Sequence, residues 1–156
     1  MGERDATLAD PVYASTAFYR ALARVPGWEG MAVTEAAQLV QRSAAPHAYA
    51  QWESEARTLA RVMTGDVAAG LACRFDAALA VTSPDTVAGA AVAALGPPPG
   101  ATVTEATGWT SASWLVAHAY MYGVTRVTYA GQVWSPSVSS WGPAPASTRV
   151  EFRVGS

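Results

Sequence analysis

The chain has 156 residues and a mass of 16.2 kDa, with 51% hydrophobic and 14% charged residues, a formal net charge of −2 and a pI of about 5.6. This length suits one domain or two small ones, and the apolar content excludes wholesale disorder. The sequence has no stripe of basic residues that could neutralise phosphates, so nucleic-acid binding is not expected. No apolar run approaches the roughly 18 residues that a membrane-spanning helix needs. The polar start, residues 1–5, is not expected to be a secretory signal.

The first 64 or so residues are expected to be helical. Asp10 followed by Pro11 predicts a capped helix over residues 11–24. Its expected apolar stripe comprises Val12, Tyr13, Ala17, Phe18, Leu22 and Val25. After a break at Pro26-Gly27, a short second helix is expected to start at the cap Thr34. A third is expected over 46–63, ended by Gly65, with Tyr49, Trp52, Ala56, Leu59, Ala60 and Met63 on one face.

After Gly70 the pattern becomes mixed, and the sequence predicts an α+β fold. Strands are expected at 71–75, 101–106, 124–129, 132–134 and 148–154, with helices at 84–95 and 111–122. Ser83-Pro84 and Thr110 are the expected helix starts, and Ala130-Gly131 is the expected hairpin turn. Residues 135–147 are expected to form a loop. The predicted domains are a helical part, 1–66, and an α+β part, 70–156.

Few residues form a pattern that points to catalysis. Glu53 and Glu55 are two apart on a helix and face different directions, so they do not form an acid–base pair. Neither His47 nor His118 has a His, Cys or acidic partner one helical turn away, so no metal or other cofactor is expected. We expect His118 to be half-buried and hydrogen-bonded. The single cysteine, Cys73, permits no internal disulfide or cysteine zinc cluster, and it is expected to be buried and inert.

Tryptophans are the most distinctive feature of the last third of the chain. Trp114 and Trp134 lie in predicted regular elements, which favours a place in the core. Trp141 lies in the expected loop, where packing and ligand contact are about equally expected.

Several N-terminal segments resemble the second half of a lysozyme-like domain of the lytic transglycosylase type, common in actinobacterial cell-wall proteins. The segments are LADPVYASTAFY at 8–19, VPGWEGM at 25–31, AAQLVQRSA at 36–44 and YAQWE at 49–53. In that family the catalytic glutamate lies upstream, in a helix, and the fold cleaves or recognises peptidoglycan glycan strands. No residue of this chain matches that glutamate, so the resemblance implies a truncated, non-catalytic half.

The C-terminal part is similar to a domain related to zinc D,D-peptidases. The similarity rests on WLVAHA at 114–119, YGV at 122–124, VTY at 127–129 and GQVW at 131–134. Active members carry two histidine-containing ligand motifs, and neither is present here. The resemblance therefore implies a metal-free relative.

These features favour a non-catalytic, cell-wall-associated module that binds peptidoglycan glycan or peptide, or a cell-wall protein. The candidate binding residues are Tyr13, Tyr19, Trp28 and Trp141. One alternative is that the chain is the C-terminal fragment of a longer peptidoglycan-cleaving enzyme. Another is an oligomerising structural module that forms a homodimer through exposed helix faces. The resemblance implies the cell envelope or secretion, whereas the absence of an export signal in this sequence implies the cytoplasm unless an upstream piece was lost, so the sequence leaves the location open.

Overall fold

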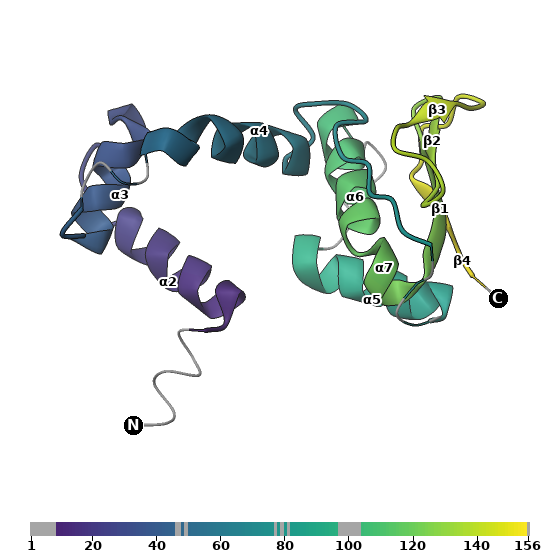
Figure 1. Cartoon of the computed structure of the whole chain (residues 1–156), viewed down its shortest axis with the longest axis horizontal. Helices are drawn as coiled ribbons and strands as arrows, with labels where there is room; N and C mark the ends of the chain where they lie inside the picture. The colour runs from purple at the N-terminus through teal and green to yellow at the C-terminus, as the bar shows by residue number, and fades with distance from the viewer. Residues whose placement is uncertain are drawn as a thin grey trace. The chain divides into compact units, whose positions relative to one another are not determined.

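The computed structural model describes residues 9–45, 48, 50–76, 78, 80, 82–96 and 104–155 (Figure 1). Contacts divide the chain into two compact units, residues 1–56 and 57–156. Helices and an antiparallel sheet are both present, so the predicted α+β class is confirmed. The domain boundary expected between residues 66 and 70 stays a prediction.

The first unit contains α2 (Pro11–Leu22), η1 (Trp28–Gly30), α3 (Val33–Gln41) and η2 (Ala50–Trp52). The start of α2 is as predicted, because the Asp10 carboxylate accepts hydrogen bonds from the amides of Val12 at 2.8 Å and Tyr13 at 3.4 Å. The predicted cap of the second helix is wrong. That helix begins at Val33, before Thr34, and its N-cap residue is Ala32 without a side-chain hydrogen bond.

The apolar stripe predicted for α2 is also wrong. Leu22 is buried, whereas Val12 and Tyr13 are 73% and 49% exposed. The reason is helix geometry, because Tyr13 and Leu22 are nine residues apart, about two and a half turns, and so lie on opposite faces. An exposed apolar surface is left on α2.

The predicted third helix begins later than expected, because η2 is followed by α4 (Glu53–Met63). Pro46, His47 and Tyr49 lie outside the described residues. The expected apolar face is wrong too, since Trp52 and Leu59 are each 60% exposed and the buried residue of α4 is Val62.

The end of α4 is as predicted. Gly65 has φ +80°, its amide donates to Val62 O at 3.3 Å, and the Asp66 amide donates to Arg61 O at 2.9 Å. This is the hydrogen-bond pattern of a Schellman cap, which requires a left-handed residue where Gly65 stands.

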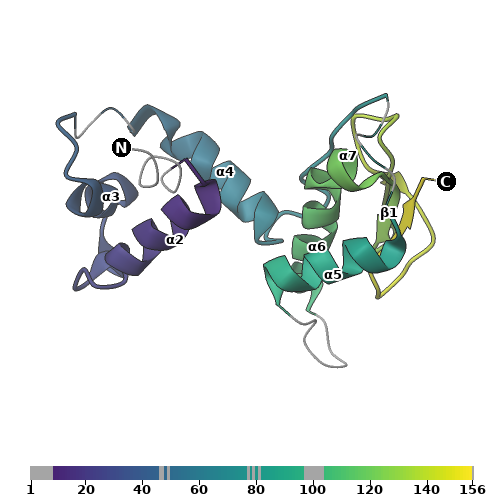
Figure 2. The same ribbon diagram turned by 90° about the horizontal axis from the view of Figure 1, so that it is seen from below.

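The second unit contains α5 (Pro84–Leu95), α6 (Glu105–Ala117) and α7 (Ala119–Tyr122) (Figure 2). Ser83 caps α5 as predicted. The strand predicted at 101–106 is wrong where it can be judged, because Thr104 caps α6 by accepting from the Thr107 amide at 3.2 Å. Residues 101–103 lie outside the described part. Thr110 is therefore inside α6, where its hydroxyl donates to Ala106 O at 3.0 Å.

The sheet of the second unit has, among the described residues, four antiparallel strands in the order β3-β2-β1-β4. They are β1 (Val124–Tyr129), β2 (Gln132–Trp134), β3 (Gly142–Pro143) and β4 (Glu151–Val154). The hairpin turn is as predicted, with φ +47° at Ala130 and +76° at Gly131. Two predictions need correction, since β3 lies in the expected loop and β4 begins at 151 instead of 148.

The segment 71–75 is not the predicted strand. The Phe75 amide donates to Pro136 O at 3.1 Å. The indole N–H groups of Trp134 and Trp141 donate to the carbonyl oxygens of Cys73 at 3.2 Å and Leu71 at 2.7 Å. Two indole donors and one backbone carbonyl, instead of a strand ladder, therefore satisfy these three backbone groups.

The core of the second unit lies between α6 and β1, and both ribbon views show this helix beside this strand (Figures 1 and 2). Trp114 and Trp134 are buried as predicted. The other buried core residues are Val87, Trp109, Ala112, Leu115, Val116, Ala119, Val124, Val127 and Tyr129. Gly108 of α6 lies directly against the Tyr129 ring, so a larger side chain there would collide with it.

Candidate functional site

The two candidate tyrosines lie on different faces of α2. Tyr19 is 65% exposed and its ring meets Phe18 edge-on, with a centroid distance of 5.4 Å. Tyr13 is also exposed, but it lies six residues earlier, which turns it away from Tyr19. The structure thus places Tyr13 and Tyr19, both candidate binding residues from the sequence, where they cannot contact the same ligand face.

Tyr19 borders a shallow, open hollow on one face of α2. Its described lining is Pro11, Val12, Ser15, Thr16, Tyr19, Arg20 and Ala23. An aromatic ring, two hydroxyls and a guanidinium group can stack on and hydrogen-bond to a polar ligand. No described lining residue is acidic, so this lining offers no carboxyl group for general acid–base chemistry.

Trp28 is half-buried at the start of η1, directly after Gly27, whose φ is +75°. Its amide donates to Val25 O at 3.4 Å. The following residue, Glu29, is exposed. Trp28 does not line the hollow beside Tyr19.

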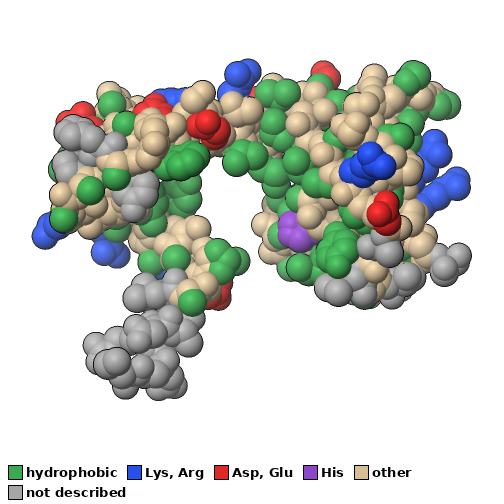
Figure 3. All heavy atoms as spheres, viewed as in Figure 1, with side chains coloured by type: hydrophobic (Ala, Val, Ile, Leu, Met, Phe, Trp, Pro, Cys, Tyr) green, Lys and Arg blue, Asp and Glu red, His purple; other side chains and the backbone are tan. Residues whose placement is uncertain are grey.

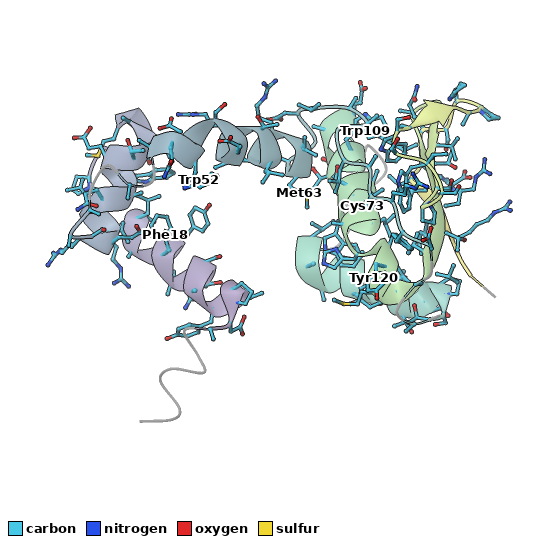
Figure 4. The ribbon with its side chains drawn as sticks, viewed as in Figure 1. Phe18, Trp52, Met63, Cys73, Trp109 and Tyr120 are labelled. Carbon is cyan, nitrogen blue, oxygen red and sulfur yellow. The ribbon has the colours of Figure 1, made fainter. Side chains whose placement is uncertain are left out.

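Trp141 belongs to the second unit and packs within it. Its indole nitrogen donates to Leu71 O at 2.7 Å, and its ring meets the buried Trp109 at 5.3 Å and an interplanar angle of 78°. Figure 4 labels Trp109 between α6 and the sheet. These contacts give Trp141 a structural role whether or not it also contacts a ligand.

His118 is half-buried and hydrogen-bonded, as predicted. Its Nδ1 lies 2.8 Å from Trp114 O, which can only accept, so Nδ1 carries the proton. The imidazole stacks on the Trp114 ring with a centroid distance of 4.1 Å. His118 ends α6 instead of lying inside it. Cys73, expected to be buried in a strand, is half-buried in the extended segment.

Within the described ranges, no three His, Cys, Asp or Glu side chains form a group that could hold a metal ion. No helix in that part of the chain has both the length and the apolar character to cross a bilayer.

A polar hollow on the sheet, lined in part by Arg126 and Arg153, was not predicted from the sequence. Both arginines were visible in predicted strands. The two arginines are neighbours because of the pairing register of β1 with β4, and no local sequence pattern reveals that register.

Comparison of the chain with protein-family models, with curated proteins and with solved structures finds no match. The lysozyme-like and peptidase-like resemblances therefore rest on the quoted sequence segments alone.

Proposed function

We propose that the chain is a non-catalytic module of the cell envelope that binds peptidoglycan through the exposed face of α2. In this proposal the N-terminal helices are a partial, three-helix lysozyme-like fold, and the second unit is a metal-free relative of the zinc D,D-peptidases. The motif resemblances support both parts.

The observation that carries the proposal is the exposure of Tyr19 beside a hollow whose surface is mainly apolar and also includes hydroxyl and guanidinium groups. Sugar rings have apolar faces that stack on aromatic rings and hydroxyls that need hydrogen-bond partners. Tyr19 supplies the ring, and Ser15, Thr16 and Arg20 supply the polar partners from the same helix face. A glycan strand offers this surface both an apolar ring face and hydroxyl groups.

The test is co-sedimentation of the full chain with insoluble peptidoglycan, together with titration of soluble N-acetylglucosamine oligomers followed by NMR. We expect Tyr19→Ala to weaken binding about tenfold, since an aromatic stacking contact contributes on the order of 1 kcal/mol beyond its buried area. Tyr13→Ala is the matched control, because Tyr13 is exposed on the same helix but outside the hollow. Equal losses for both variants, or no binding by the unmodified chain, would contradict the proposal.

Homodimerisation is a second candidate function, favoured by the large apolar side chains exposed in the first unit. Val12 is 73% exposed, Trp52 60%, Leu39 48% and Val33 46%. Figure 3 shows hydrophobic side chains at the surface of this unit. Large exposed apolar patches mark interaction sites. Light scattering at micromolar concentration tests this function, and a strictly monomeric mass would exclude it at that concentration.

A further inference from the structure

Two arginines lie directly opposite each other on neighbouring strands of the second unit. Arg126 of β1 pairs with Arg153 of β4, next to the pair formed by Val127 and Phe152. Val127 is fully buried in the core. Because side chains alternate along a strand, Arg126 projects from the opposite face of the sheet, and both arginines are exposed there.

A β-bulge at Thr125 comes immediately before Arg126. Val124 pairs with Val154 and Arg126 with Arg153, so Thr125 is the extra residue of β1. Bulges re-aim the side chains beside them and are common next to binding sites. The bulge brings Arg126 into register with Arg153.

This arrangement is electrostatically unfavourable by itself. Like charges directly opposite on a sheet are destabilising. No hydrogen bond or ion pair joins either guanidinium group to another described residue. The nearest acidic residue along β4, Glu151, pairs with Thr128 and accepts a hydrogen bond from Ser147 Oγ at 3.4 Å. An anion held between the two arginines would remove this repulsion.

The two arginines line a polar hollow of about 370 Å³. The other polar side chains in its lining are Thr128, Ser147 and Glu151. Figure 3 shows basic side chains at the outer edge of the molecule beside β1 and β4. With two arginines and one glutamate, the described lining carries a net charge of +1 at neutral pH.

We propose that this hollow binds a small oxyanion, a carboxylate or a phosphate group, between Arg126 and Arg153. Guanidinium groups hold planar or tetrahedral oxyanions through paired N–H donors. The hydroxyl of Thr128 donates a further hydrogen bond. Glu151, beside the pair, accepts from an N–H or O–H group next to the bound anion. This site lies wholly within the second unit and is independent of the glycan-binding proposal.

The test is an NMR titration of the full chain with inorganic phosphate and, separately, with N-acetylalanine, whose carboxylate has an N–H nearby. Ionic strength is held constant with chloride, because exposed charges are screened by salt. We expect saturable shifts of the backbone amides of residues 126–128 and 151–153. Preference for N-acetylalanine identifies a carboxylate site, and preference for phosphate identifies a phosphate site; either outcome supports an oxyanion site.

Arg126→Gln and Arg153→Gln are each expected to weaken binding about tenfold or more, because each removes a charge-assisted contact. Arg149→Gln is the matched control, since Arg149 is exposed just before β4 but does not line the hollow. A second readout is thermal stability. Phosphate or N-acetylalanine should raise the Tm of the unmodified chain and of Arg149→Gln, but not that of Arg153→Gln. The proposal is overturned if neither probe gives saturable shifts, or if all three variants bind equally.

Discussion

Replacing Gly65 with alanine should strongly destabilise the second unit. Gly65 has φ +80°, which strains any residue with a Cβ by about 1 kcal/mol. A Cβ there would also collide with the backbone of α6, lying 2.8 Å from the carbonyl carbon of Ala106 and 2.9 Å from the amide nitrogen of Thr110. Moving two helices apart adds about 1–3 kcal/mol of overpacking strain. The expected loss is therefore about 2–4 kcal/mol in the free energy of unfolding.

The matched control is Gly131→Ala in the hairpin turn of the same unit. Gly131 has nearly the same φ, +76°, but the nearest atom to an added Cβ is Ala144 O at 3.7 Å, an ordinary contact. This variant should lose only the backbone strain, about 1 kcal/mol. Thermal unfolding followed by circular dichroism should then show a Tm decrease of about 8–32 °C for Gly65→Ala and about 4–8 °C for Gly131→Ala. Equal decreases for the two variants would refute the collision argument.

Three further predictions concern the second unit. Burial, with a smaller effect of the Glu105 carboxylate, raises the pKa of Tyr129 above its unfolded value of about 10. The contribution of Tyr129 to the free energy of unfolding is therefore fully present below about pH 10, and it is lost as the pH rises toward the pKa of Tyr129 in the folded chain. Denaturant titrations from about pH 8 to about pH 11 should show this decline, and a decline of equal size in Tyr129→Phe would contradict it. Trp141→Phe should cost about 1 kcal/mol through loss of the hydrogen bond to Leu71 O, as measured by urea unfolding; an unchanged midpoint would mean that this bond does not stabilise the fold. Thr104→Ala should cost about 1 kcal/mol by removing the cap of α6, whereas Thr104→Ser should be close to neutral in the same assay.

Local signals in the sequence predicted what depends on local geometry. Asp10 and Ser83, each followed by proline, mark the starts of α2 and α5, because a cap involves only the next few amides. The start of α6 was placed six residues too late, since Thr104 and Thr110 are both able to cap. Gly108, a poor helix former, lies between them and is accommodated where the Tyr129 ring packs.

Features that depend on distant partners were not predicted. The segment 71–75 has the sequence pattern of a strand, but two of its carbonyl groups accept hydrogen bonds from indoles 61 and 70 residues away. The pairing of Arg126 with Arg153 likewise depends on strand register. For the candidate site, aromatic character and an expected loop or helix-face position selected Tyr13, Tyr19, Trp28 and Trp141. These criteria could not separate the packed indole of Trp141 from the exposed ring of Tyr19.

The indole hydrogen bonds to the segment 71–75 also constrain the order of folding. Trp134 and Trp141 reach carbonyl groups that are made 61 and 70 residues earlier during synthesis. Closing such long loops carries an entropic penalty, and non-local contacts slow folding. Until the β1–β2 hairpin and Trp141 are available, the carbonyl groups of Leu71 and Cys73 are hydrogen-bonded to water instead of to the indoles. The second unit can therefore complete its native hydrogen bonds only after the chain has been synthesised beyond Trp141.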